Sequence, residues 1–474
     1  MVATRPVAAG RLARQFESGS SHPIVETGVL HRAISSLAVL VVVACLPVYL
    51  LGDFSLSSTG SVSVPFWLIL VWSGVRIVTS SSLGLEALHR TVFWLYVYVW
   101  LALSPLLQLA TGQRPLAIQL SPSNYEAAGI IVVIGILAYE LANAFSNPQP
   151  RRPPSFKTDA KHLRWLVVGG LLASLCVVAY LGPATFLESR ETLSDSLYSA
   201  SDLDNSFGAS VSAIAAVPCF AALIALLVKR YDNTYHWDRA DSVLVALSIA
   251  ENALINNPIA QSRFWFTTVW GTIVILLLWK RSRLWFHLLP AVLLIGAIFV
   301  FPFSDVFRYS DPDAQRLEIS SPAKVLATKG DFDSLEQIAW GKKTADVEGM
   351  TLGRQTLGAA AFWIPRRYWA DKPVDTGIVL AERAGLENTS LSAPLWVEAY
   401  GEGGYILVFL AFLGVGWSHK RIDVLMSACT PSVLTLIVFY QLVILRGSLI
   451  ASMATSASLA VVLFAFTRMR SRAT

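Results

Sequence analysis

The stretch AISSLAVLVVVACLPVYLL, residues 33–51, decides the fold class of this chain. It carries no charged side chain, and its length matches the roughly 20 residues that a helix needs to cross the hydrocarbon core of a bilayer. Similar apolar runs recur along the 474 residues, so that 54% of the chain is hydrophobic and only 15% is charged. Soluble domains carry about 25% charged residues. The sequence therefore predicts an all-α, polytopic membrane protein.

Working outward from this run, we expect about twelve transmembrane helices. The seventh is the weakest, because residues 241–256 are short and polar enough to form a buried, re-entrant or surface helix instead. The expected spans are residues 33–51, 62–79, 91–110, 126–145, 164–181, 209–228, 241–256, 264–279, 284–302, 402–417, 424–444 and 448–466.

Basic residues between the runs predict the orientation, since loops rich in Lys and Arg stay on the cytoplasmic side. If the N-terminus is inside and all the spans cross, Lys229, Lys280 and Arg468 fall on that side with their basic neighbours. Omitting the seventh span would move the basic residues 280–283 outside. We therefore expect cytoplasmic tails at residues 1–28 and 468–474.

The same threading predicts one large extracytoplasmic loop at residues 303–401. Helices one to nine precede it in residues 29–302, and helices ten to twelve follow it in residues 402–467. At about 100 residues, the loop is far longer than the usual connection between helices. It contains helix-like stretches at residues 324–329, 333–340 and 351–363. Function is expected in this loop.

Composition and residue types exclude several classes of function. The net charge of +5 is explained by basic cytoplasmic loops, so a nucleic-acid partner is not expected. The seven histidines are scattered and none lies in the large loop, and no pattern of metal ligands is present. Motifs for nucleotide binding and the GxSxG motif are also missing. We expect no metal and no cofactor.

The densest group of chemically active residues is the basic segment, residues 353–383. Its guanidinium groups offer the forked donors that suit phosphate oxygens, and its aromatic side chains can stack on sugar faces or lie at the level of lipid headgroups. An alternative interpretation is an amphipathic interfacial helix whose arginines pair with headgroups. The basic residues are Arg354, Arg366, Arg367, Lys372 and Arg383, with Trp369 among the aromatic ones.

Two further places offer polar groups. Arg263 ends the short turn NPIAQSR, residues 257–263, where it either binds an anion or extends to the outer interface. Glu398 lies in the polar approach to the tenth span, near Tyr400, and is either a proton-transfer group or an acid favoured by the dipole at a helix start. Glu251 lies inside the seventh span, where we favour a structural hydrogen bond.

These features together resemble bacterial O-antigen and exopolysaccharide repeat-unit polymerases of the Wzy type. The resemblance is carried by the many spans, the long late loop, the turn ending at Arg263, the run IPRRYWADKP at residues 364–373, and the pattern Glu398-x-Tyr-x-x-x-Gly404. It implies a GT-C-like polymerase/ligase architecture in the cytoplasmic membrane. It also implies a metal-independent, inverting glycosyltransferase that joins undecaprenyl-diphosphate-linked repeat units on the outer face, beside a flippase and a chain-length regulator.

The resemblance also implies roles for the polar residues. Arg263, Arg366 and Arg367 would hold the donor diphosphate, and Glu398 would act as general base or orient the acceptor. An Arg367→Ala variant would then reach the membrane but make no polymer. The residues expected to support substrate binding are Arg354, Arg366, Lys372, Arg383, Trp369 and Tyr400.

Other functions stay open at this point. An O-antigen ligase shares the layout, but members of that family use a histidine in the large loop, and this loop has none. A flippase or other transporter of lipid-linked oligosaccharides needs charged residues along a path across the bilayer, and Glu251 is the main deeply placed acid. A deletion strain separates these alternatives by where the lipid-linked units accumulate.

Overall fold

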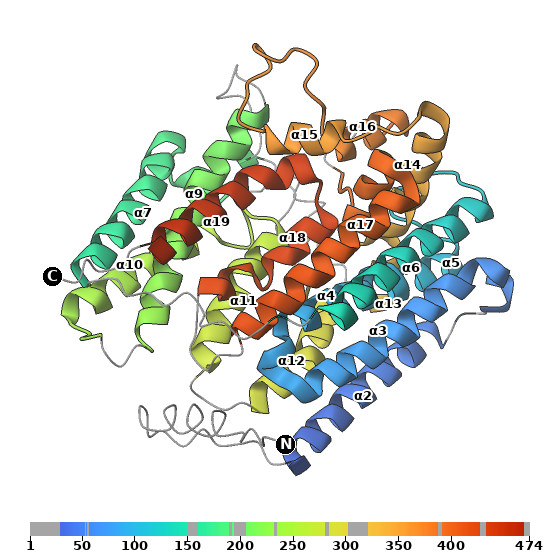
Figure 1. Cartoon of the computed structure of the whole chain (residues 1–474), viewed down its shortest axis with the longest axis horizontal. Helices are drawn as coiled ribbons and strands as arrows, with labels where there is room; N and C mark the ends of the chain where they lie inside the picture. Colours follow the sequence, from blue (N-terminus) through green and yellow to red (C-terminus); the bar gives the residue numbers. More distant parts are fainter. Residues whose placement is uncertain are drawn as a thin grey trace, which may run out of the picture.

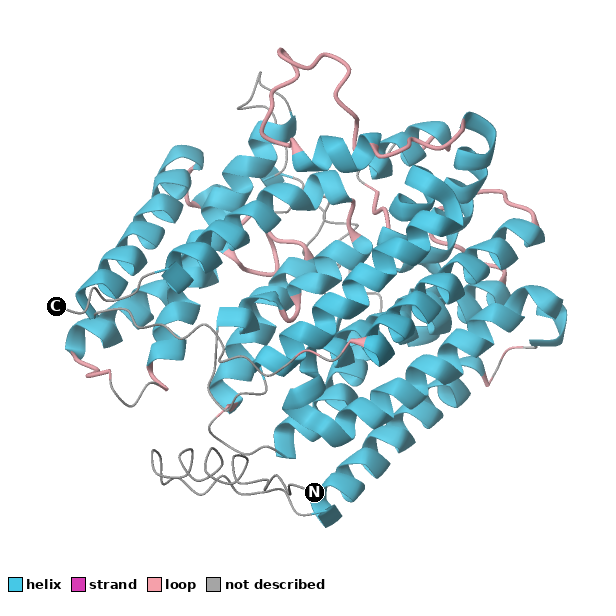
Figure 2. Cartoon of the chain, in the orientation of Figure 1, coloured by secondary structure: helices cyan, strands magenta, loops and turns pink. Residues whose placement is uncertain are grey.

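The computed structural model describes residues 29–52, 54, 56–146, 148, 160–188, 192–193, 205–231, 235–279, 284–301, 321–386, 391–426 and 433–468. Within these ranges every regular element is a helix, and Figure 2 shows only helices joined by loops. The predicted N-terminal tail, residues 1–28, lies outside the described residues, as do residues 469–474 of the predicted tail at 468–474 and residues 280–283 and 302–320.

The helices form two groups that share one bundle (Figure 1). In the first group, the long helix α17 packs along α6, and α2 packs against α3 and α12. It contains α2 (Val29–Leu51), α3 (Val64–Leu83), α4 (Leu88–Tyr98), α5 (Ser104–Thr111), α6 (Pro122–Phe145), α12 (Leu284–Ile295) and α17 (Leu395–Met426). The second group has its own hydrophobic core and contains α7 (Ala160–Leu181), α9 (Asn205–Lys229), α10 (Arg239–Ile255), α11 (Arg263–Leu278), α18 (Tyr440–Arg446) and α19 (Leu449–Arg468).

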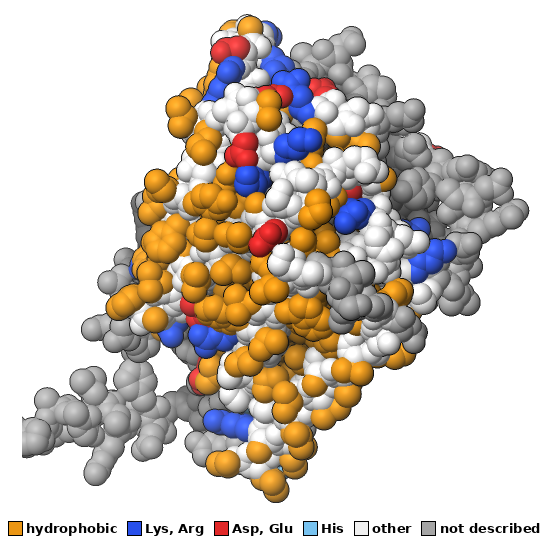
Figure 3. Space-filling view, turned by 90° about the vertical axis from the view of Figure 1, so that its right-hand side faces the viewer, with side chains coloured by type: hydrophobic (Ala, Val, Ile, Leu, Met, Phe, Trp, Pro, Cys, Tyr) orange, Lys and Arg blue, Asp and Glu red, His pale blue; other side chains and the backbone are white. Residues whose placement is uncertain are grey.

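Among the described residues, six helical stretches are long and apolar enough to cross a membrane, and four shorter apolar helices accompany them. Many of their large apolar side chains face outward, including Leu37 on α2, Val71 on α3 and Leu137 on α6. Figure 3 shows such side chains spread over the middle and lower part of one face, with most of the charged side chains of that face in its upper part. A broad apolar surface is what contact with lipid requires, so the chain has the character of a polytopic membrane protein.

The predicted spans 62–79 and 91–110 fall within one continuous helical stretch, Gly60–Thr111. Gly84 reverses the chain direction there with a positive φ of 57°, a conformation that costs glycine little. The ring of His287 packs against Gly84 and bonds to the Ser81 carbonyl at 2.6 Å. The weak seventh span, residues 241–256, is a helix, α10, whose first turn is fixed by a capping box between Asp238 and Asp241.

Several shorter helices come from the predicted large loop. Three of them lie in the upper part of Figure 1: α14 (Ser334–Glu348), α15 (Arg354–Ala360) and α16 (Thr376–Arg383). Deeper in the bundle, α13 (Pro322–Thr328) packs against α5 and is followed by η7 (Gly330–Phe332). The three loop stretches expected to be helical correspond to α13, α14 and α15, whereas α16 was not expected. Loop helix α14 packs against α6 and α17, and α15 packs against α19.

The junction between loop and bundle is reinforced where α17 bends at Gly403 and Gly404. The bend frees the carbonyls of Gly401 and Glu402 from the helix. The backbone N–H groups of Thr351 and Leu352 donate to them at 2.9 and 3.0 Å. The loop is thereby attached to a membrane helix by backbone hydrogen bonds, which holds α15 near the start of α19.

Candidate functional site

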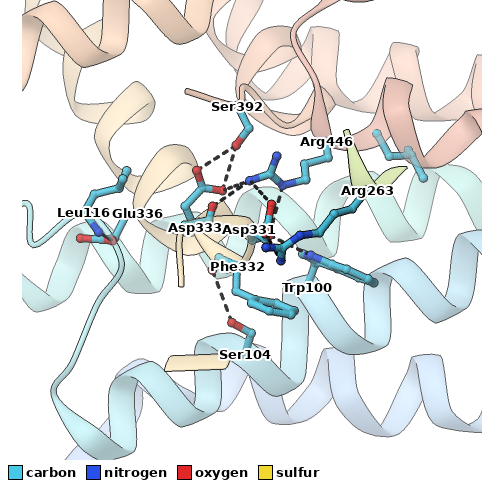
Figure 4. Close-up of polar contacts among 12 residues, drawn as sticks. Trp100, Ser104, Leu116, Arg263, Asp331, Phe332, Asp333, Glu336, Ser392 and Arg446 are labelled. Atoms are coloured by element: carbon cyan, nitrogen blue, oxygen red, sulfur yellow. Dashed lines mark hydrogen bonds and ion pairs between the residues drawn. The ribbon is translucent and has the colours of Figure 1, made fainter. Parts of the chain in front are cut away.

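Two arginines from apolar helices meet two aspartates from the loop at the centre of this junction (Figure 4). Arg263 is the first residue of α11 and Arg446 the last of α18, whereas Asp331 lies in η7 and Asp333 precedes α14. We call these four residues the arginine–aspartate cluster. Its two positive and two negative charges balance, as buried ionic groups must.

Arg446 is the most extensively bonded member of the cluster. Its guanidinium donates to the backbone carbonyls of Gly330 at 2.7 Å and Asp331 at 3.1 Å, and it contacts the Asp333 carboxylate at 3.2 Å. It also lies over the Phe264 ring at 5.3 Å. The forked donors of arginine allow one side chain to make all of these contacts.

Arg263 forms an ion pair with the Asp331 carboxylate and lies over the Phe301 ring at 5.2 Å. Its position follows from the local sequence, since Asn257 caps the turn before it and the Ser262 hydroxyl accepts from the Trp265 N–H at 3.3 Å to begin α11. Asp331 is thus shared, with Arg446 reaching its other carboxylate oxygen at 3.9 Å.

The bundle holds η7 in place through its backbone. The Trp100 indole donates to the Asp331 carbonyl at 2.9 Å, and the Gln108 amide donates to the Phe332 carbonyl at 2.7 Å. The Ser104 hydroxyl donates to the Leu326 carbonyl at 2.8 Å. These donors come from the continuous stretch of α4, η3 (Val99–Leu103) and α5, where they are buried. The loop carboxylate is therefore positioned by groups inside the bundle.

Asp333 differs from Asp331 in how firmly it is held. The Ser392 hydroxyl lies 2.8 and 3.0 Å from its two carboxylate oxygens, and its side chain is only 2% exposed. Burial raises the pKa of Asp333, while Arg446 and Ser392 oppose that rise. The Asp331 side chain is 12% exposed, so it is the more accessible carboxylate of the two.

A second pair of carboxylates, Glu398 and Asp375, lies at the start of α19 and contacts Leu449 and Ser448. Glu398 accepts from the Thr376 hydroxyl at 2.9 Å and from the Leu449 N–H at 3.1 Å, and it is 2% exposed. Asp375 accepts from the Ser448 hydroxyl and from the Gly377 N–H. Burial raises the pKa of Asp375, while these hydrogen bonds lower it. The contacts of Glu398 dock the loop on the bundle.

The basic segment folds largely on itself. Arg366 donates to the carbonyls of Lys372 and Pro373 at 2.9 and 3.2 Å, and the buried Lys372 ammonium donates to those of Phe362 and Ile364 at 2.7 and 2.9 Å. Both side chains thus brace the turns of residues 361–373.

The remaining predicted residues of the segment are more open. Arg354 pairs with Asp371 at 3.2 Å, and both side chains are exposed. Arg367 is exposed and lies over the Tyr368 ring at 4.5 Å. Trp369 is partly exposed in the same turns. The segment therefore presents cationic and aromatic surface outside the arginine–aspartate cluster.

Arg383 and Tyr400 bond to loop helix α14. Arg383 forms an ion pair with Glu348 at 2.6 Å, and the Tyr400 hydroxyl donates to Asp346 at 3.1 Å. Arg263 is thus the predicted residue that lies in the arginine–aspartate cluster. Sequence reasoning missed Arg446, Asp331 and Asp333. The available signal for Arg446 was an arginine alone between two apolar runs.

The cluster suits a multiply charged anion, because two guanidinium groups converge from different helices on one carboxylate, that of Asp331. Within the part of the chain that the structure describes, no group of three or more His, Cys, Asp or Glu residues is arranged to hold a metal ion. No known protein family matches the chain, and no significant match is found among curated proteins or solved structures.

Proposed function

We propose that this protein is an oligosaccharide repeat-unit polymerase. In this role it is a membrane glycosyltransferase that moves a growing glycan from undecaprenyl diphosphate to an incoming lipid-linked repeat unit. The product is an O-antigen-like, capsular or exopolysaccharide chain. The reaction takes place at the outer face of the cytoplasmic membrane, where the loop helices meet the bundle.

The observation that carries the proposal is the convergence of Arg263 and Arg446 on Asp331 at this junction. A glycosyl diphosphate donor needs its leaving group neutralised as the bond to the sugar breaks. Fixed guanidinium groups supply that charge without a metal, and each can bind phosphate oxygens through two parallel hydrogen bonds. The surrounding apolar helices suit a polyprenyl chain.

The proposal includes a topology of about twelve crossings with both termini in the cytoplasm. Residues 303–401 are then extracytoplasmic, and the exposed Arg354 and Arg367 with Trp369 face incoming glycan or lipid headgroups. Arg366, Lys372 and Arg383 shape that surface, and Tyr400 and Glu398 connect it to α17. A flippase supplies the lipid-linked units, and a chain-length regulator is the expected partner.

A deletion strain tests the proposal. Loss of the protein should leave single repeat units on undecaprenyl diphosphate at the outer face, because units are exported but not joined. Wild-type protein should restore long chains, whereas Arg263→Lys should reach the membrane in normal amounts and restore few. Accumulation of units confined to the cytoplasmic face would instead indicate a flippase. Normal polymer that is only absent from its final lipid acceptor would indicate a ligase.

A reconstituted reaction tests the same proposal without the cell. Purified protein in lipid vesicles should convert repeat units extracted from the deletion strain into a ladder of longer glycans. Addition of a metal chelator should leave that ladder unchanged. Failure of the wild-type protein to extend any unit under these conditions would overturn the polymerase assignment.

A further inference from the structure

Asp331 lies between the two arginines that carry the proposed function. It forms an ion pair with Arg263 on one side and faces Arg446 at 3.9 Å on the other. Its backbone is fixed separately, since its carbonyl accepts from the Trp100 indole at 2.9 Å and from the Arg446 guanidinium at 3.1 Å. The carboxylate can therefore move by side-chain rotation while the peptide stays in place.

A diphosphate competes effectively with this carboxylate for the two arginines. It brings more negative charge and more acceptor oxygens than a carboxylate, and arginine binds phosphate through paired hydrogen bonds. Displacement leaves Asp331 partly buried beside an anion and separated from Arg263 and Arg446, and an ionised carboxylate is costly in such a place. Protonation removes that cost.

We propose that Asp331 is the group that accepts the proton of the acceptor hydroxyl, released for this role when the donor diphosphate takes over Arg263 and Arg446. The inference rests on the polymerase function proposed above. Donor binding thereby creates the base only when there is a glycosyl group to transfer. In the empty site, Asp331 keeps the arginines paired and in position.

The step balances in atoms and charge. The acceptor hydroxyl oxygen forms a bond to the anomeric carbon of the donor glycan as that carbon's bond to the phosphate oxygen breaks. The bonding pair leaves with undecaprenyl diphosphate, whose charge Arg263 and Arg446 neutralise. The hydroxyl proton passes to an Asp331 carboxylate oxygen. Departure of the diphosphate returns the arginines to Asp331, which then loses the proton to water.

Neither Asp333 nor Glu398 suits this role as well. Asp333 is held by Ser392 through both carboxylate oxygens and is 2% exposed. Glu398 accepts from Thr376 and from the Leu449 N–H and is equally buried. Asp331 combines direct contact with both arginines and the greater exposure. The expected assignment of the base to Glu398 is therefore replaced in this inference by Asp331.

The test separates donor binding from turnover in full-length protein reconstituted in lipid. Undecaprenyl diphosphate is the binding probe, and extracted lipid-linked repeat units are the substrate. Asp331→Asn should bind the probe as tightly as wild type or more tightly, because its amide does not repel the phosphates. Its kcat should fall by about 100-fold or more, the usual loss when a proton-transfer group is removed. Asp331→Glu keeps the charge but displaces it, and should also lose kcat.

The control is Asp423→Asn, since Asp423 is another buried carboxylate paired with an arginine. It accepts from the Arg90 guanidinium at 2.7 Å and from the His89 N–H at 2.8 Å. This variant should lose stability but keep wild-type kcat per folded molecule. An Asp331→Asn enzyme with wild-type kcat would overturn the role of Asp331 and leave the polymerase standing. Loss of probe binding in step with turnover would show that Asp331 only positions the arginines.

Discussion

Arg446 is the residue on which the proposed site depends most, because one guanidinium bonds Gly330, Asp331 and Asp333 together. Arg446→Lys keeps the charge but places it on a single nitrogen that lacks the planar fork. We expect this variant to reach the membrane and to lose turnover by about 10-fold or more. Measurement of glycan ladders per amount of membrane protein checks this expectation.

Arg90→Lys is the matched control for Arg446→Lys, since Arg90 also pairs with a buried aspartate, Asp423. Its turnover per folded molecule should be unchanged. Equal losses of turnover in both variants would mean that Arg446 contributes only to stability. Arg446→Ala is a poorer test, because it removes the arginine that pairs with the buried Asp333, at a cost of about 3–5 kcal/mol.

The burial of Glu336 should make the stability of the folded protein depend on pH. It is fully buried and accepts from the N–H groups of Leu116 and Ile118 at 2.7 and 3.0 Å. Burial outweighs these bonds and raises its pKa from 4.5 to about 7. The folded state therefore binds more protons than the unfolded state between these values, so this contribution to stability is full below pH 4.5 and is lost as pH rises to 7.

The expected contribution is about 3 kcal/mol, which is an upper value for a shift of this size. Melting temperatures of the purified protein from pH 5 to pH 8 measure it. Glu336→Gln should flatten the decline across this range, because the amide does not ionise. A variant that declines as steeply as wild type would show that another group is responsible.

Some residues of the site could be predicted from the sequence and others could not. Arg263 was predictable because it follows a polar turn at the mouth of an apolar run. Arg446 and Asp331 were not, because they are 115 positions apart and carry no shared motif. What joins them is a hydrogen bond from the Arg446 guanidinium to the Asp331 carbonyl, which also accepts from Trp100. The indole of Trp100 is indistinguishable in sequence from that of an interfacial tryptophan.

The bend in α17 is the element that connects the loop to the bundle. Gly404 adopts φ 64° and ψ −153°, a combination that is essentially restricted to glycine and costs other residues about 1–3 kcal/mol. Gly404→Ala should therefore lower the melting temperature, loosen the bonds from Thr351 and Leu352, and reduce polymer formation. Thermal unfolding and glycan ladders measure the two effects.

Gly414 provides the control within the same helix. A methyl group added there would meet nothing within 4 Å beyond the backbone of its own helix, and alanine favours a helix by about 1 kcal/mol over glycine. Gly414→Ala should leave both stability and polymer unimpaired. Equal behaviour of the two variants would contradict the special role of the bend. The tenth span was predicted to begin at residue 402, whereas α17 begins at Leu395 and bends at Gly403 and Gly404. Hydropathy does not indicate such a bend, because it does not depend on backbone conformation.

At the scale of the whole molecule, most apolar runs predicted helices correctly, because each must satisfy its own backbone hydrogen bonds in lipid. The run at residues 424–444 is an exception, since α17 ends at Met426 and α18 begins only at Tyr440. Apolar runs predicted the loop helices less completely. Helix α16 is short, and it is held through Asp375 and Thr376, which bond Ser448 and Glu398. Such a helix depends on partners distant in sequence, so local periodicity does not indicate it.

The orientation of the whole chain gives the last prediction. Val347 on loop helix α14 is 78% exposed, and the proposed topology places it outside, whereas Arg281 stays in the cytoplasm only if α10 crosses the membrane. In a background without the four native cysteines, Val347→Cys should react with a membrane-impermeant thiol reagent in spheroplasts, because its thiol is accessible. Arg281→Cys should react only after the membranes are opened. Labelling of Arg281→Cys in sealed spheroplasts would show that α10 does not cross the membrane. Protection of Val347→Cys would place the arginine–aspartate cluster on the wrong side of the membrane for glycan polymerisation.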